Sequence, residues 1–332
     1  MKMIINFKME SIMLKKFISA ISAILISTVV FTGCNSAPLK DDGKINIVCT
    51  VFPAYDWTKQ IIGNSSNINL TYLLGNGSDL HNFQPTADDM IKISECDIFI
   101  YVGGESDEWV EKSLSNAQNK DMTVINLMEV LSDKVKEEEI KEGMADEHNH
   151  NEHEIDYDEH VWLSLKNAQM CVTKINEALI KSDYENSDKY IENSYSYISE
   201  LQSLDNKFYE LFESDSPTLI FGDRFPFRYF IEDYNLDYFA AFTGCSADTQ
   251  ASFETITFLA QKTDELNADT VFAIENSDCT IADAVIQNTE SKLQNIAVLD
   301  SAQSVTNQQI NDGTTYLSIM EKNYNVLQEA FK

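Results

Sequence analysis

The sequence is poor in positive charge. It has 24 Lys and Arg residues against 54 Asp and Glu, a formal net charge of −30, and Arg224 and Arg228 are its only arginines. Binding to nucleic acid requires clustered Lys and Arg side chains that neutralise phosphates. We therefore exclude nucleic acid as a partner and expect a chain that attracts cations.

Paired metal-binding and catalytic motifs are also lacking. None of the six cysteines forms a CxxC motif, which excludes a zinc finger. No HExxH motif occurs, and His153 and His160 stand seven residues apart, which argues against a metallohydrolase. Most of the cysteines after Cys34 are expected to be small buried apolar residues. A disulfide between Cys245 and Cys279, which both follow predicted strands, remains an alternative.

The first 33 residues have the pattern of a targeting segment. Lys15 and Lys16 precede an apolar stretch over 17–31, which is shorter than the roughly 20 apolar residues of a membrane span. The small residues before Cys34 resemble a bacterial lipobox. We predict a signal peptide over 1–33, lipidation at Cys34 and a tether over 34–43. The chain would then be extracytoplasmic and anchored to the bacterial cell membrane by its lipid, with cleavage alone as the alternative.

Short apolar runs alternate with helical patterns from residue 44 onward, which predicts an α/β fold. Strands are expected over 45–51, 68–74, 97–102 and 123–127, and again over 218–222, 237–242, 270–275 and 296–300. These two sets of four strands predict two Rossmann-like lobes, each with a four-stranded, mainly parallel sheet. Between them, apolar residues recur every three or four positions from Asn186 to Glu213 without Pro or Gly, which predicts one long, rigid helix. We assign residues 44–183 to the N-terminal lobe, 184–214 to the linking helix and 215–332 to the C-terminal lobe.

The five histidines are the most informative residues present, because four of them lie close together in the sequence. His148, His150 and His153 belong to the tract 137–159, which has eleven Asp or Glu, a single Lys and no apolar periodicity. This composition predicts a disordered loop whose histidines bind additional metal. His160 differs, since the apolar sequence Val-Trp-Leu follows it and anchors it as a fixed ligand requires.

Potential ligands follow predicted strands in both lobes. His81 follows the strand 68–74, Asp223 follows 218–222, and Glu275 and Asp278 close and follow 270–275. In open parallel sheets, ligands bind beyond the carboxyl ends of the strands. Together with His160, these positions predict a metal site in the cleft between the lobes.

Two segments carry a resemblance to a known family. GSDLHNFQPTADD, around His81, resembles a GxxPHxYEPTPxD loop, and DEHVWLSLKNA, around His160, resembles a DPHVWLDPxNA segment. Both belong to the metal-binding lipoproteins of bacterial ABC importers for zinc and manganese, and the resemblance covers essentially the whole mature chain. It implies a non-enzymatic protein that binds Zn²⁺ through His81 and His160 and delivers it to a membrane permease. The His- and acid-rich loop is typical of the zinc members. Manganese is the alternative metal, and a metal-dependent surface adhesin or a metallohydrolase is the alternative from another class.

The resemblance also implies ligands from the C-terminal lobe. The family usually has His or Glu in a segment HxAFxYF, but this chain has Arg224 there, in RFPFRYF. A guanidinium has no lone pair to offer, so we expect Asp223 to replace it and Arg224 either to hold a site carboxylate in place or to pair with surface acids. ENSDCTIADA resembles the segment that supplies an acidic ligand, which favours Asp278, with Glu275 as the alternative. Each of these two acids has a competing role as a helix cap near Thr280.

Overall fold

The computed structural model describes residues 43–144, 156–214, 216–245 and 250–332. Cys34 and the three histidines His148, His150 and His153 lie outside these residues, so the predictions made for them stay predictions. None of the helices in the described part of the chain is long and apolar enough to cross a membrane.

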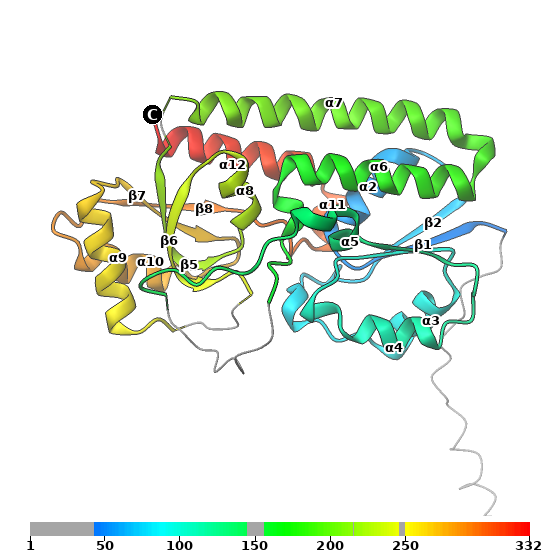
Figure 1. The fold of residues 1–332 in the computed structure, drawn as a ribbon, viewed down its shortest axis with the longest axis horizontal. Coiled ribbons are helices and arrows are strands. Elements are labelled where there is room, and N and C mark those ends of the chain that lie inside the picture. Colours follow the sequence, from blue (N-terminus) through cyan, green and yellow to red (C-terminus); the bar gives the residue numbers. More distant parts are fainter. Residues whose placement is uncertain (1–42, 145–155, 215, 246–249) are drawn as a thin grey trace, which may run out of the picture. The chain divides into compact units, whose positions relative to one another are not determined.

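Two four-stranded parallel sheets form the framework (Figure 1). The first has the order β2-β1-β3-β4 and the second the order β6-β5-β7-β8. Their strands are β1 (Ile45–Cys49), β2 (Ile68–Tyr72), β3 (Ile98–Tyr101), β4 (Thr123–Asn126), β5 (Thr218–Phe225), β6 (Asp237–Thr243), β7 (Thr270–Ile274) and β8 (Asn295–Leu299). Every one of the eight predicted runs overlaps a strand, and the predicted α/β fold with two sheets is confirmed.

Helices connect the strands and cover the sheets. The first half of the chain has α2 (Phe52–Ile62), α3 (Ala87–Glu95), α4 (Trp109–Ser115), α5 (Leu127–Leu131) and α6 (Leu165–Ser182). The second half has α8 (Arg228–Asp233), α9 (Phe253–Glu265), α10 (Thr280–Asn288), α11 (Asn307–Asn311) and α12 (Tyr316–Ala330). Short 3₁₀ helices η1 (Leu80–Asn82), η2 (Glu105–Asp107), η3 (Ser132–Lys134), η4 (Val161–Leu163) and η5 (Tyr184–Asn186) complete the set.

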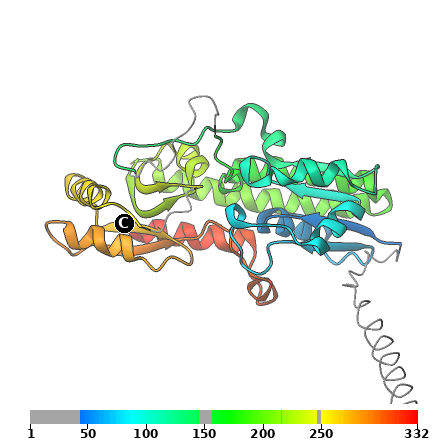
Figure 2. The ribbon, with the colours of Figure 1, turned by 90° about the horizontal axis from the view of Figure 1, so that it is seen from below.

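The predicted linking helix is α7 (Ser187–Phe212), with 26 residues. It packs on α2 and α6 of the first half and on α12 near the C-terminus, and Figure 1 shows it running along both halves. In the second view, α12 lies along the second half, and one of its ends reaches the first half, where it packs on α2 (Figure 2). One large hydrophobic cluster contains residues of both sheets and of α7, whereas a smaller cluster is confined to the second half.

Strand β5 is longer than the sequence predicted. It extends to Phe225, and its register against β6 shifts between Phe221 and Arg224. Such an irregularity redirects the side chains that follow it. Asp223 therefore lies within the irregular end of a strand and not, as predicted, in the loop after it.

Candidate metal centre

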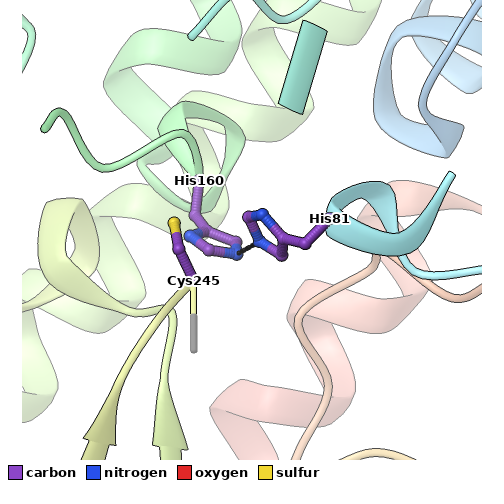
Figure 3. Close-up of side chains that lie close together, drawn as sticks. All are labelled: His81, His160 and Cys245. Carbon is purple, nitrogen blue, oxygen red and sulfur yellow. Dashed lines mark hydrogen bonds between the residues drawn. The ribbon is translucent and has the colours of Figure 1, made fainter. Parts of the chain in front are cut away.

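His81 and His160 meet although they are 79 residues apart in the sequence (Figure 3). His81 lies in η1, and His160 directly precedes η4. Their Nε2 atoms are 3.2 Å apart. Tetrahedral zinc with bonds of about 2.0–2.1 Å to imidazole separates two ligand nitrogens by about 3.3 Å. The spacing therefore fits two histidines that share one ion.

The other ring nitrogen of each histidine is held by a neighbour. Nδ1 of His160 lies 3.0 Å from an oxygen of Asp158, which also accepts the backbone N–H of His160. Nδ1 of His81 lies 2.8 Å from the hydroxyl of Ser106 and 3.4 Å from a carboxylate oxygen of Glu159. Partners at Nδ1 fix the ring orientation and leave Nε2 to the metal, which is the usual arrangement around zinc-bound histidines.

Burial and charge act differently on the two rings. Burial, together with the nearby His160, lowers the pKa of His81 to about 3. Burial also lowers the pKa of His160, but the carboxylates of Asp158, Glu159 and Asp79 outweigh this effect and raise it. His81 is thus a neutral imidazole at physiological pH, the form in which histidine binds metal.

The apolar anchor predicted for His160 is present. Val161, Trp162 and Leu163 are completely buried. The indole N–H of Trp162 donates to the carbonyl of Ser301 at 2.7 Å, and Tyr316 donates its hydroxyl to the carbonyl of Trp162. These contacts tie the position of His160 to the second half of the chain.

Cys245 brings a third potential ligand to the pair. One ligand atom each from His81, His160 and Cys245 lies within 4.8 Å of the other two, and Figure 3 shows the thiol at the end of β6 beside the imidazoles. Gly244 makes this approach feasible, because a Cβ there would lie 2.9 Å from the carbonyl oxygen of Phe225 and 3.2 Å from Cε1 of His160. Cys245 and Cys279 are both free thiols, so the alternative of a disulfide between them is wrong for this structure.

The sequence analysis did not identify Cys245 as a ligand. One signal was available, because Cys245 follows the carboxyl end of β6 as His81 follows that of β2. The rule that ligands gather beyond strand ends therefore applied to this thiol as well as to the carboxylates.

The carboxylates predicted as ligands line a hollow that includes Asp79 and Arg224 but neither His81 nor His160. Asp223 accepts the backbone N–H groups of Arg224 and Ile274 at 2.8 and 3.3 Å. The described structure does not include Asp223 in the group formed by the two histidines and Cys245. Its role as a ligand stays a prediction.

The two acids after β7 have other partners in the structure. Asp278 is exposed and accepts the backbone N–H of Thr280 at the start of α10, the capping role that competed with ligation. Glu275 accepts the backbone N–H and the hydroxyl of Ser301 at 2.8 and 2.5 Å. Burial and the neighbouring Asp300 raise the pKa of Glu275 to about 7. Ligation by either acid also stays a prediction.

Arg224 holds a carboxylate beside the histidines. Its guanidinium donates to Asp79 at 2.9 Å, and the other oxygen of Asp79 accepts the backbone N–H of His81 at 3.1 Å. Burial alone raises the pKa of Asp79, but the charges of Arg224 and His81 and the hydrogen bonds from both residues together outweigh burial and lower it. An ion pair between the two halves thus positions the short helix that carries His81.

The predicted loop over 137–159 is described only at its two ends. Glu137 and Tyr157 form an antiparallel bridge, and Asp158 and Glu159 are buried beside the histidines. Lys141 forms an ion pair with Asp237 at the start of β6. These contacts hold both ends of the tract on the fold, and the segment 145–155 with its three histidines lies outside the described residues.

Comparison with known proteins shows the relationship of this chain. The model of the family described as the periplasmic component A of the zinc-uptake complex matches residues 47–330. The zinc-binding lipoprotein AdcA of Streptococcus pneumoniae (strain ATCC BAA-255 / R6) is 30% identical over 292 residues, which are 87% of this chain and 56% of AdcA. This chain thus spans about half the length of AdcA. The high-affinity zinc uptake system protein ZnuA of Bacillus subtilis (strain 168) is 26% identical over 298 residues, 89% of this chain and 90% of ZnuA.

Solved structures agree with these relatives. The Zn(II)-bound ZnuA-like domain of Streptococcus pneumoniae AdcA superposes with a TM-score of 0.67 at 26% identity and covers 87% of this chain and 99% of that domain. The resemblance stated from the two histidine motifs is confirmed. The chain belongs to the family of periplasmic zinc-uptake component A proteins.

Proposed function

We propose that this chain is an extracytoplasmic zinc-binding protein that takes up one Zn²⁺ ion through His81 and His160 and delivers it to an ABC import permease. The main observation behind this proposal is that the two Nε2 atoms face each other at 3.2 Å. The Nδ1 atom of each ring already has a polar partner. The two Nε2 atoms are within hydrogen-bonding distance of each other, so both rings direct their second nitrogen to the one place where an ion would bridge them.

The relatives support the same assignment. AdcA is described as zinc-binding and ZnuA as part of a high-affinity zinc uptake system. AdcA is also described as a lipoprotein, which supports lipidation at Cys34 and anchoring to the membrane. Residues 44–183, 184–214 and 215–332 would then be the two lobes and their linking helix.

Zinc fits the two histidines better than manganese does. Imidazole suits zinc, whereas manganese favours carboxylate, carbonyl and water oxygens. The described group around His81 contains a second imidazole and a thiol, and its carboxylates Asp158 and Glu159 contact the Nδ1 side of the rings. Neither carboxylate lies on the Nε2 side that would face the ion.

Competition with a chelator of known zinc affinity tests the proposal. The metal-free protein is compared with His81→Ala, His160→Ala and the control His153→Ala, which removes a histidine of the acidic tract. We expect one tight site in the parent and in the control. Either cleft substitution should weaken that site by orders of magnitude, because one of a few protein ligands is lost. Unchanged affinity in both cleft variants would overturn the proposal.

A further inference from the structure

We propose that Cys245 supplies the third protein ligand as a thiolate, so that the site is a His₂Cys site that favours thiol-seeking cations such as Zn²⁺ over Mn²⁺. The inference rests on the proposed function and specifies its chemistry. Neither the motif resemblance nor the relatives assign a ligand to this position.

The geometry lies within reach of a bonded site. Zinc bonds of about 2.3 Å to sulfur and 2.0–2.1 Å to nitrogen place tetrahedral S and N ligands about 3.6 Å apart. The potential ligand atoms of Cys245, His81 and His160 lie within 4.8 Å of one another. A shift of about 1 Å, which side-chain rotation in a loop provides, therefore closes the site around an ion.

The backbone around Cys245 presents the thiol to the histidines. The N–H of Cys245 donates to a carboxylate oxygen of Glu138 at 3.1 Å. Gly244 packs against His160 and the carbonyl of Phe225 so closely that a side chain there would meet both. Strand β6 thus ends against the imidazole, and the next residue carries the sulfur.

A thiolate from Cys245 also provides the metal ligand that Arg224 cannot provide. The segment RFPFRYF has arginine where the family resemblance leads one to expect a ligand, and Arg224 is engaged with Asp79. Cys245 reaches the histidines from the neighbouring strand β6, which pairs with β5. The second half of the chain therefore supplies its ligand from the end of β6, and not from β5, the strand that carries Arg224.

Burial and the carboxylates of Glu138, Asp158 and Glu159 raise the pKa of the Cys245 thiol, so the thiolate forms only when a bound cation displaces the proton. As the Zn–S bond forms, the thiol releases its proton to solvent, and two neutral imidazoles with one thiolate leave the bound dication at +1. Asp79, Asp158 and Glu159 lie around the histidines and compensate this charge. Because thiolate is a soft ligand and manganese prefers oxygen, the site discriminates against Mn²⁺.

Cobalt(II) gives a direct readout of the sulfur, because thiolate bound to Co²⁺ produces an intense charge-transfer absorption in the near ultraviolet that nitrogen and oxygen ligands do not produce. The full chain is titrated with Co²⁺ as the parent, as Cys245→Ser and as the control Cys279→Ser, which removes the other partly exposed thiol of the second half. We expect the absorption in the parent and the control and its loss in Cys245→Ser. The Cys245→Ser change should also weaken zinc binding by more than about tenfold, since one of three protein ligands is lost.

A second measurement needs no variant. Alkylation of Cys245 in the parent protein, followed by peptide mass spectrometry, should be slowed by stoichiometric Zn²⁺ and not by Mn²⁺. Stoichiometric Co²⁺ binding without the charge-transfer absorption, and alkylation indifferent to zinc, would overturn the thiolate and leave the proposed function standing. Failure of the parent to bind either Zn²⁺ or Co²⁺ would instead overturn the proposed function itself.

Discussion

The two halves of the chain have the same strand order but contribute differently to the metal centre. In each sheet the second strand lies at one edge, next to the first. The loop after the second strand carries His81 in the first half and Cys245 in the second half. Equivalent topology thus brings one potential ligand from each half to the same place, while the kind of potential ligand depends on which residue the loop carries. His160, after the acidic tract, has no counterpart of this kind among the described residues of the second half.

The halves also differ in how their ligands are supported. Both histidines have polar partners at Nδ1 that come from the first half, namely Asp158, Ser106 and Glu159. The second half acts on neighbouring residues of the first half, through the ion pair of Arg224 with Asp79, the hydroxyl of Tyr229 on the carbonyl of Asp158, and the contacts of Ser301 and Tyr316 with Trp162. Affinity should therefore depend most on supports within the first half, and the following substitutions test that order.

The largest effect is expected at Asp158. Asp158→Ala removes the acceptor of the Nδ1 proton of His160, which frees the ring to rotate and to change tautomer, and should weaken zinc binding about 10–100-fold. Asp158→Asn keeps an acceptor oxygen and loses only the charge, so its loss should be smaller. Competition with a chelator measures the dissociation constant for zinc of both variants. Equal affinity of Asp158→Ala and the parent would show that this support is dispensable.

A smaller effect is expected at the ion pair between the halves. Arg224→Ala leaves the partly buried carboxylate of Asp79 without its cation and should lower the free energy of unfolding by about 1–2 kcal/mol, between the values for exposed and buried pairs. Arg228 is the matched control. It pairs with Glu232 four residues along the same helix and with Glu139, both more exposed than Asp79, so Arg228→Ala should cost only about 0.3–0.5 kcal/mol.

Urea denaturation of the metal-free proteins measures this difference. If both arginine variants lower the free energy of unfolding by the same amount, the ion pair of Arg224 with Asp79 stabilises the protein no more than the ion pairs of Arg228 do.

The smallest effect on the tight site is expected from removing residues 145–155, with a short Gly/Ser linker in their place. This change deletes His148, His150 and His153 but keeps the ends of the tract, where Asp158 and Glu159 support the histidines. We expect the same tight zinc affinity and fewer weakly bound ions per chain, because an acidic, histidine-rich segment attracts cations. Equilibrium dialysis with metal analysis measures both the affinity of the tight site and the number of weakly bound ions per chain. Loss of the tight site would show that the deleted segment takes part in it.

The sequence predicted the fold and the histidine pair because both depend on local patterns. Alternating apolar runs placed the eight strands, and the Val-Trp-Leu sequence after His160 indicated a fixed position, which the complete burial of these residues explains. Cys245 could not be ranked as a ligand in the same way. Its nearness to His160 depends on Gly244, on the irregular pairing of β5 with β6 and on contacts between halves, and none of these is visible in a linear pattern. The sequence also could not decide whether Asp278 binds metal or caps α10, and in the structure it accepts the backbone N–H of Thr280 at the start of this helix.

The large hydrophobic cluster has a consequence for how the protein unfolds. Trp57 of the first half makes an edge contact with Tyr316 at 5.2 Å between ring centroids, and Phe208 of α7 makes one with Phe230 of the second half at 5.0 Å. Because the two sheets share this core, neither half retains a complete interior when the other melts. The chain should therefore show a single calorimetric transition, with equal calorimetric and van't Hoff enthalpies. If His81, His160 and Cys245 hold one ion as proposed, that ion should shift this one transition to a higher temperature that rises with the logarithm of its concentration.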